Sequence, residues 1–410
     1  MDEKTSAKLS AKKAAIEDKG EQSSVMEPLV LSQGAPRRAE LTELAVKLTA
    51  AASGFRRSLP DGVISALANL VRAMNCYYSN LIEGHDTHPV DIERALKKDF
   101  SADQKQRNLQ LEAAAHISVQ EWIDKGGLQE RETTADGIKE AHRRFCEELP
   151  KELLWVEHPK TKEQLEVIPG EFREHYVEVG NHVAISPPAI PRFLTRFEGA
   201  YNGLGVAETI LATAAAHHRL LWIHPFLDGN GRVARLMSHA MLLRALDTGG
   251  VWSVARGLAR DVETYKQHLI ACDSTRRNDL DGRGNLSEEA LSEFTRFFLE
   301  ICVDQVTYME GLVRPDKLRA RIQLWANEEI ATDSLPKQAA NLLEALIYRG
   351  EIPRGEVKDV LNVSDRSARR VISALADHSV VASSTPKGPL RIAFPAKLAS
   401  RWMPGLFPDQ

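Results

Sequence analysis

The chain has 410 residues, 43% hydrophobic and 27% charged, a composition typical of a soluble globular protein with room for more than one core. A net charge of −4 excludes a global basic field, so DNA binding would need a local patch. No apolar run could span a bilayer, and residues 1–20 lack the apolar segment of a signal peptide, so no membrane association is expected. Four scattered cysteines indicate free thiols in a reducing cytoplasm: Cys76, Cys146, Cys272 and Cys302.

The N-terminal third predicts a polar segment followed by helices. Residues 1–36 are polar and poor in aromatic residues, which predicts a mobile tail. An N-terminal helical region is expected over 37–150, with helices at 41–52, 60–84, 91–96, 104–124 and 133–149. The helix over 60–84 has the clearest pattern, because apolar residues recur three and four apart from Val63 to Leu81.

This helix ends with Ser79-Asn80-Leu81-Ile82-Glu83-Gly84, and Gly84 suits the position just after a helix C-terminus. Ser79 and Glu83 are four residues apart and therefore share a face. The helix dipole disfavours a carboxylate at this end, so Glu83 needs a cationic partner or a functional reason. A plain surface carboxylate is the alternative.

Residues 171–185 change character and predict a β-hairpin. Six β-forming residues flank a Gly180-Asn181 turn: Phe172, Tyr176, Val177, Val179, Val183 and Ile185. Helices are expected again over 192–201 and 207–223. An ordinary structural hairpin is one interpretation of this segment.

The next stretch carries most of the chemistry and reads His224-Pro225-Phe226-Leu227-Asp228-Gly229-Asn230-Gly231-Arg232-Val233-Ala234-Arg235. It separates two apolar helical runs, which predicts a tight polar turn between two buried helices. Gly229, Asn230 and Gly231 all tolerate positive φ, and such turns point backbone N–H groups at anions.

The arginines, the aspartate and the histidine of the motif add the other groups that nucleotide transfer needs. Arg232 and Arg235 lie three apart at a helix start, where guanidinium groups and the dipole both favour phosphate. Asp228 suits Mg²⁺, which binds one carboxylate together with substrate phosphates. His224 could take a proton from an attacking hydroxyl. Together these residues indicate transfer of a nucleotide group, although each alone is common in structural turns.

The stretch resembles the signature of the Fic-domain family, His-x-Phe-x-Asp/Glu-Gly-Asn-Gly-Arg-x-x-Arg, at every specified position. The resemblance implies a helical fold and transfer of AMP from ATP to a hydroxyl side chain of a target protein. It implies His224 as general base, Asp228 as the Mg²⁺ ligand and Phe226 as a core anchor. Gly229 to Arg232 would cradle the α- and β-phosphates, and Arg235 would reach the γ-phosphate.

The same resemblance extends to three other segments. Ser79, Glu83 and Gly84 match an inhibitory helix reading Ser/Thr-x-x-x-Glu-Gly/Asn, which implies that Glu83 pairs with Arg235 and inhibits in cis. The hairpin over 171–185 would be the flap that pairs with an extended target segment. Tyr265 would contact the adenine or ribose side of ATP, with a core role as the alternative.

The remaining chain predicts the end of the core and a second domain. A Fic core is expected over 151–312, with a short connection at 251–256 and helices at 261–272 and 286–312, followed by a connecting helix over 313–332. In 333–410, helices are expected over 339–348, 354–361 and 365–377, followed by two β-rich runs at 380–384 and 390–394, which predicts a winged helix. Its third helix offers Arg366, Arg369 and Arg370, and its wing offers Lys387. These fit DNA contact, whereas protein interaction or dimerisation is the alternative.

The whole chain is thus expected to be mainly α, a Fic-type core with a flap and a winged-helix domain. The leading function is an autoinhibited, Mg²⁺-dependent protein adenylyltransferase that uses ATP and modifies a Ser, Thr or Tyr hydroxyl of a target or of itself. Alternatives are hydrolytic removal of AMP, transfer of another nucleotide or phosphate group, and a DNA-binding regulator with a nucleotide-sensing core. A homodimer is left open. His217 and His218 beside His224 would suggest zinc, but no carboxylate or cysteine completes a ligand set.

Overall fold

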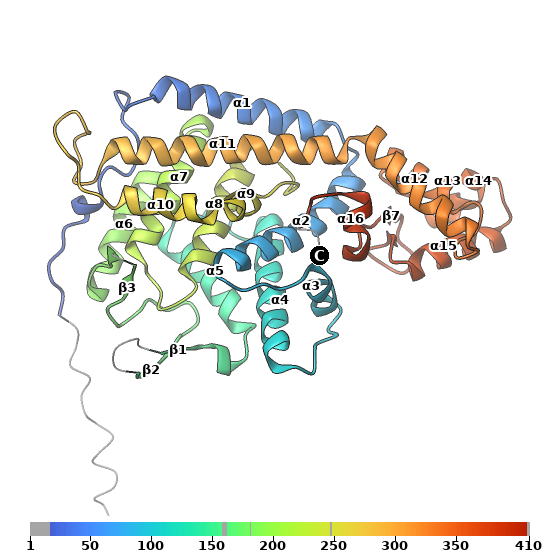
Figure 1. The fold of residues 1–410 in the computed structure, drawn as a ribbon, viewed down its shortest axis with the longest axis horizontal. Helices are drawn as coiled ribbons and strands as arrows, with labels where there is room; N and C mark the ends of the chain where they lie inside the picture. Colours follow the sequence, from blue (N-terminus) through green and yellow to red (C-terminus); the bar gives the residue numbers. More distant parts are fainter. Residues whose placement is uncertain (1–16, 158–161, 181, 247, 408–410) are drawn as a thin grey trace, which may run out of the picture.

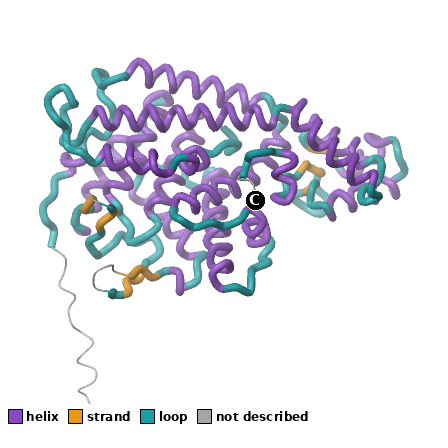
Figure 2. The backbone as a smooth tube through the Cα atoms, viewed as in Figure 1, coloured by secondary structure: helices purple, strands orange, loops and turns teal. Residues whose placement is uncertain are grey.

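Helices make up most of the regular structure, as expected for a mainly α protein. The computed structural model describes residues 17–157, 162–180, 182–246 and 248–407. Figure 2 shows the helices as a continuous mass with only short strands at its margins. Within the described residues, no helix combines the length and the hydropathy needed to cross a membrane.

The helical core is built around two helices that meet at the motif. α7 (Val206–Ile223) and α8 (Asn230–Leu246) pack against each other and are joined by residues 224–229. Both are buried on nearly every face, since they lie at the centre of the bundle. The surrounding helices are α5 (Ala135–Glu147), α6 (Ile190–Tyr201), α9 (Val254–Arg260) and α10 (Val262–Cys272).

α9 corrects the expected connection over 251–256. The helix begins after Ser253, whose hydroxyl accepts a hydrogen bond of 3.3 Å from the backbone of Arg256. Gly257 lets it approach the next long helix, because a Cβ there would lie 2.2 Å from Ile301. The segment is too short for its apolar spacing to predict a helix. Close packing against Ile301 of the next long helix stabilises the helix instead.

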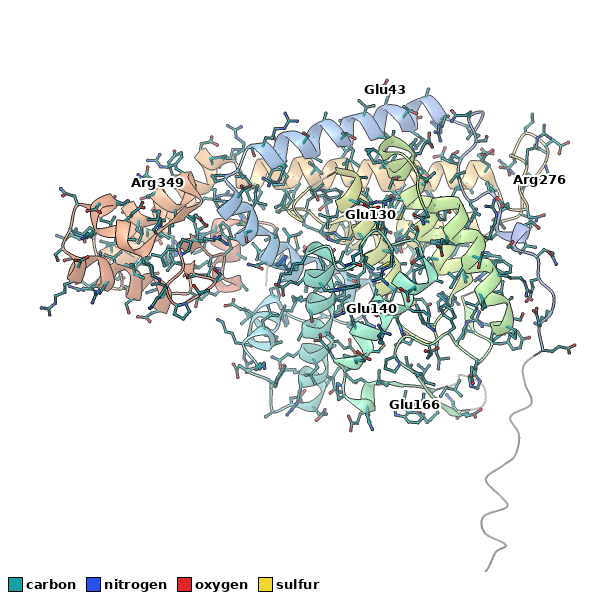
Figure 3. The ribbon with its side chains drawn as sticks, turned by 180° about the vertical axis from the view of Figure 1, so that it is seen from behind. Glu43, Glu130, Glu140, Glu166, Arg276 and Arg349 are labelled. Atoms are coloured by element: carbon teal, nitrogen blue, oxygen red, sulfur yellow. The ribbon has the colours of Figure 1, made fainter. Side chains whose placement is uncertain are left out.

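Two long helices cover one side of this core. α1 (Arg38–Arg57) and α11 (Glu288–Val313) lie side by side along one edge of the molecule (Figure 1). α1 turns Leu41, Leu48 and Phe55 inward, and Glu43 points outward from its exposed face (Figure 3). The apolar spacing of three and four residues is what fixes the buried face.

The region in which the sequence predicts an inhibitory helix packs beside the motif helices. It consists of α2 (Asp61–Ile82), α3 (Pro89–Leu96) and α4 (Gln104–Asp124). α2 is buried along most of its length, and Gly84 adopts the positive φ of 86° expected just beyond its end. α2 contacts α4, α9 and α8, so it lies directly beside the motif helix.

The flap is shorter than the hairpin expected over 171–185. Only β3 (Glu178–Val179) and β4 (His182–Val183) pair, with Glu178 opposite Val183, and Asn181 of the expected turn lies outside the described residues. Residues 171–177 form no strand, and Arg173 within them binds the backbone carbonyls of His175, Ile185 and His224. A hairpin that was not expected, β1 (Trp155–Glu157) with β2 (Gln164–Glu166), precedes the flap.

The N-terminal segment corrects the expected tail. Residues 1–16 lie outside the described part of the chain, but residues 17–36 pack on the core. Met26 and Leu29 are buried, and the Leu29 carbonyl accepts a 2.6 Å hydrogen bond from the Tyr201 hydroxyl. The segment, which includes the short helix η2 (Ser23–Met26), is thus a strap rather than a mobile tail.

The C-terminal unit follows the connecting helix α12 (Pro315–Ala331). Its small antiparallel sheet has the order β5-β7-β6, and a winged helix remains our prediction for this unit. Its elements are α13 (Ala339–Arg349), β5 (Glu351–Ile352), α14 (Val357–Leu361), α15 (Asp365–Asp377), β6 (Val381–Ala382), β7 (Leu390–Ile392) and α16 (Ala399–Trp402). Short 3₁₀ helices occur at Lys151–Leu153, Pro187–Ala189, Arg354–Glu356 and Ala396–Leu398. Trp402 and Leu406 are buried, so the end of the chain packs back on the protein.

Candidate active site

The motif residues all lie on the loop between α7 and α8 or on the first turns of α8. His224 ends α7 in the left-handed conformation, with φ of 51°, and α8 begins at Asn230. The first N–H groups of a helix have no intrahelical partner, so this end of α8 offers donors and a positive dipole to an anion.

His224 is half-buried and its ring has a defined orientation. Nδ1 lies 3.2 Å from the carbonyl oxygen of Leu221, so Nδ1 carries the proton and donates it to that oxygen. Burial lowers the pKa of His224 to about 4. The ring is therefore neutral at pH 7, with Nε2 as the nitrogen that can accept a proton.

The loop is held in shape by Asn230 and Phe226. The Asn230 side chain accepts from the Phe226 N–H at 2.9 Å and donates to the Phe226 carbonyl at 2.8 Å. Phe226 is buried and stacks on His142, with ring centroids 3.8 Å apart. The Asn230 side chain thus fixes the loop rather than facing a ligand, and Phe226 is the core anchor that the resemblance implied.

The two glycines of the motif have different roles. Gly229 has φ of 80° and makes the turn, whereas Gly231 lies within α8. A Cβ at Gly231 would lie 2.3 Å from Oε1 of Glu83 and 3.2 Å from Arg235. Gly231 is therefore required by the close approach of Glu83, not by its own backbone conformation.

Arg235 is occupied by the end of α2. Its Nε donates to the Ser79 hydroxyl at 2.8 Å, and its Nη2 donates to Oε1 of Glu83 at 2.5 Å. Arg235 is 2% exposed. Burial by itself would raise the pKa of Glu83, but the charge and hydrogen bond of Arg235 outweigh it and lower that pKa. The structure thus brings together Ser79, Glu83 and Arg235, and Gly84 ends the helix beside them.

Arg232 is also occupied, by residues that the sequence did not single out. Its Nη2 lies 3.0 Å from Glu112 of α4 and 3.1 Å from His85, and Glu112 in turn lies 2.8 Å from His85. The hydrogen bond to Glu112 raises the pKa of His85. Both arginines of the motif are therefore paired with carboxylates from the N-terminal region.

Arg173 is a second residue that was not anticipated. Its guanidinium donates to the carbonyl of His224 at 2.7 Å and to that of Ile185 at 2.7 Å, and its backbone N–H donates to Pro225. Arg173 therefore ties both ends of the flap to the turn that carries His224. Burial lowers its pKa to about 10, so it remains charged at pH 7.

Tyr265 does not lie on an open nucleotide surface. It is 2% exposed, and its hydroxyl is 2.7 Å from Nε2 of His217, whose Nδ1 is 2.9 Å from the Ser238 hydroxyl. These contacts favour the core interpretation of Tyr265, and its contact with ATP stays a prediction. They also give His217 a structural role, and His218 is likewise bound to Asp273 at 3.0 Å.

Asp228 is exposed at the entrance of the turn. Among the described residues, no ion pair or hydrogen bond engages its carboxylate, and no group of three or more His, Cys, Asp or Glu is placed to hold a metal. A single accessible carboxylate beside an anion-binding turn suits Mg²⁺, which completes its shell with phosphates and water. The residues present therefore fit that ion only together with a phosphate ligand.

The helical bundle thus brings together a neutral histidine, an accessible carboxylate and a helix N-terminus that carries two arginines. This arrangement suits a phosphate ligand. Residues 132–242 match the family model of the Fic/DOC family.

Curated relatives are similar to part of the chain. The chain is 30% identical over 171 residues to the protein adenylyltransferase Fic of Drosophila erecta, an alignment that covers 41% of this chain and 32% of that protein. The protein of the same name from Drosophila willistoni gives 30% identity over 171 residues and 31% of its length. The chain thus spans about a third of the length of the curated relatives it matches.

Solved structures of Fic proteins are also similar. A Fic family protein from Desulfovibrio desulfuricans G20 aligns with a TM-score of 0.48 and 16% identity, over 85% of this chain and 96% of that one. A Fic-domain signalling protein from Bacteroides thetaiotaomicron aligns with a TM-score of 0.48 and 21% identity, over 66% of this chain and 95% of that one.

Proposed function

We propose that this protein is an autoinhibited adenylyltransferase that transfers AMP from ATP to a hydroxyl side chain of a protein. The observation that carries the proposal is the 2.5 Å ion pair between Arg235 and Glu83, formed beside a histidine whose Nε2 can accept a proton. A phosphate-binding arginine held by a carboxylate of its own chain has to be released before it can bind a triphosphate. The names of the curated relatives support AMP as the transferred group.

In the proposed reaction His224 acts as the general base. The target hydroxyl gives its proton to Nε2 while its oxygen attacks the α-phosphorus, and pyrophosphate leaves. A pKa of about 4 makes His224 a weak base in this state. Bound triphosphate would bring negative charge beside the ring and so raise that pKa toward neutrality, where general-base catalysis is most efficient.

The phosphates would be held by the start of α8 and by Arg235. The N–H groups from Gly229 to Arg232 would face the α- and β-phosphates, and Arg235 would pair with the γ-phosphate once Glu83 has left. Mg²⁺ held by Asp228 would neutralise phosphate charge. Arg173 would hold the flap and His224 in a fixed relative position, because it binds the backbone carbonyls of both Ile185 and His224.

The test is transfer of label from ATP that carries it on the α-phosphate. Glu83→Gly should raise the labelling of protein well above that of the parent, because it frees Arg235. Glu43→Gly removes a carboxylate from the exposed face of α1 and serves as the matched control, which should leave labelling unchanged. His224→Ala in the Glu83→Gly background should abolish transfer. Equal labelling by Glu83→Gly and the parent would contradict inhibition by Glu83.

Hydrolysis of AMP from a modified protein is a second candidate, and the exposure of Glu83 favours it. Only Oε1 of Glu83 is engaged by Arg235, and the side chain is 34% exposed, so Oε2 could orient a water molecule. The test is the release of free AMP from a modified protein. Release by the parent that disappears in Glu83→Gln would establish hydrolysis, rather than transfer, as the activity.

A DNA-binding role for the C-terminal unit is favoured by the outer face of α15. Arg366, Arg369 and Arg370 are exposed there, and no ion pair engages them among the described residues. Their charge suits the phosphates of duplex DNA. A gel shift that weakens with salt and with Arg369→Ala would support the role, whereas a shift unaffected by either would contradict it.

A further inference from the structure

A cleft of about 610 Å³ lies between α2 and the sheet of the C-terminal unit. α2 lines it with Ala66, Leu70 and Ala73, and the sheet lines it with Ala382 of β6 and Arg391 of β7. β7 and α2 are in contact and lie close together in Figure 1. The volume falls within the range of about 300–1,000 Å³ that is usual for small-molecule sites.

Several apolar side chains in this cleft are open to water. Leu96 of α3 is 50% exposed, and Phe394 and Phe407 are only partly buried, although all three line the cleft. Covering apolar surface in a concave site is favourable, because it removes that surface from water. The lining therefore suits a ligand with an apolar body.

The charged side chains of the lining favour an acidic group on the same ligand. Four are cations and two are carboxylates, namely Arg72, Lys97, Lys125, Arg391, Glu93 and Glu121. The two lysines pair with the two carboxylates. The arginines pair at 3.0 and 2.7 Å with Asp124 and Glu351, which do not line the cleft. Positive charge is thus in excess on the side that faces the cleft, and it attracts an anion.

We propose that this cleft binds a small organic anion, a molecule with an apolar ring system or chain and one acidic group. The apolar body would cover Leu96, Phe394 and Phe407. The acidic group would pair with Lys97 and Lys125, whose side chains are 59% and 70% exposed. Exposed ion pairs contribute little, so these lysines can exchange their present carboxylates for that of a ligand at small cost.

A ligand in the cleft would contact α2 and the C-terminal unit at once. The C-terminal unit is also tied to α3, because the Ala396 N–H donates a 2.8 Å hydrogen bond to Glu93. The far end of α2 positions Glu83, which pairs with Arg235 at 2.5 Å. A molecule that bridges the two walls binds best while they keep this spacing, so it stabilises α2 in the position seen here.

The first experiment measures binding of anilinonaphthalene sulfonate, a fluorescent probe with an apolar ring system and one acidic group, to the full chain. Its fluorescence should rise and saturate with one probe bound per chain. Ala382→Trp places an indole in the cleft from an exposed position on β6 and should abolish this binding. Ala50→Trp, at an exposed position on α1, is the matched control and should leave binding unchanged.

The second experiment tests the acidic group. Lys97→Gln with Lys125→Gln should weaken binding of the sulfonate about fivefold. Lys47→Gln with Lys105→Gln removes the same charge at exposed positions outside the cleft and should leave the affinity unchanged. Phenylnaphthylamine keeps the rings but lacks the acidic group, so the parent and both double variants should bind it equally.

The third experiment tests the effect on α2. Hydrogen exchange in peptides that cover residues 61–84 should slow when the sulfonate binds to the parent, because the bound molecule opposes local opening of the helix. The same addition to Ala382→Trp should leave the exchange of these peptides unchanged.

Each experiment has a result that would overturn the inference. Binding that survives Ala382→Trp would place the probe outside the cleft. Equal affinity in the two lysine double variants would exclude an anion as the ligand. Unchanged exchange over residues 61–84 on binding would exclude the effect on α2. None of these measurements involves ATP, so the proposed function stands or falls separately.

Discussion

The hydroxyl of Tyr78 donates a 3.0 Å hydrogen bond to the carbonyl oxygen of Leu406, which joins α2, the helix that carries Ser79, to the C-terminal unit. Phe407 also meets Tyr77 edge to face at 5.8 Å. At the other end of α2, a Cβ on Gly62 would lie 2.2 Å from the Gly350 carbonyl oxygen. The C-terminal unit therefore contacts α2 near both ends, and the contact at Tyr78 lies within about one turn of Ser79 and Glu83.

Tyr78→Phe should weaken the inhibition. It removes one buried hydrogen bond, worth about 1 kcal/mol, and so loosens the end of α2 that positions Glu83. We expect self-labelling above that of the parent and below that of Glu83→Gly, with no further gain when both changes are combined. Tyr348→Phe, at a residue 58% exposed, is the control. A lower melting temperature without any gain in labelling would make the contact structural only.

Glu112→Gln should lower the free energy of unfolding by more than the loss of an exposed carboxylate would. Arg232 is 7% exposed in its side chain and Glu112 12%, so the change leaves a buried guanidinium without its carboxylate, at a cost of about 3 kcal/mol. Glu40→Gln removes one of the two carboxylate partners of Arg37, in a pair about half exposed, and should cost less than about 1 kcal/mol. Urea unfolding of both variants measures the difference. Equal costs would show that the Arg232 pair is not a buried pair in solution.

Local signals in the sequence were enough to locate most helices. The expected helices over 104–124 and 365–377 coincide with α4 and α15, because Asp103 and Ser364 cap them with side-chain hydrogen bonds. The motif lies in a turn between two buried helices, as the sequence predicts. Glu83 also pairs with Arg235, as expected. α9 was missed, although Ser253 just before it is a capping residue type.

The partners of the site could not be predicted, since they depend on contacts between distant segments. Arg173 acts on the backbone carbonyls of a turn about fifty residues away, which leaves no trace in its local sequence. α4 did carry a signal: four polar residues, Glu112, His116, Gln120 and Asp124, are spaced four apart and face inward. Such a stripe looks like a solvated face until a second helix is known to cover it.

His116 should make the protein less stable in acid. It is fully buried, neither ring nitrogen has a hydrogen-bond partner among the residues that the structure describes, and burial lowers its pKa from 6.5 to about 3. Between these values the unfolded chain binds a proton that the folded chain does not, so stability present above pH 6.5 is lost as pH falls, by about 1.4 kcal/mol per pH unit.

His116→Leu removes this loss. Relative to the parent, its free energy of unfolding should gain about 2 kcal/mol between pH 7 and pH 5, in urea titrations at each pH. His88→Leu, at an exposed position, is the control for adding a leucine. A difference between His116→Leu and the parent that does not change with pH would show that His116 titrates normally in the folded protein.

Asn230→Ala should abolish transfer even when the inhibition is removed. It deletes both hydrogen bonds to the Phe226 backbone, at 2.9 and 2.8 Å, and leaves that buried N–H and carbonyl unpaired. We expect a loss of about 2–3 kcal/mol in stability. Transfer should also be lost in the Glu83→Gly background, because the turn between His224 and α8 then has no fixed shape. Asn230→Asp keeps the acceptor for the Phe226 N–H but loses the donor to the Phe226 carbonyl. Its stability and its transfer activity should lie between those of Asn230→Ala and those of the protein that keeps Asn230. If Asn230→Ala retains full transfer in that background, the shape of the turn must be set by Gly229 and the stacking of Phe226 on His142 alone.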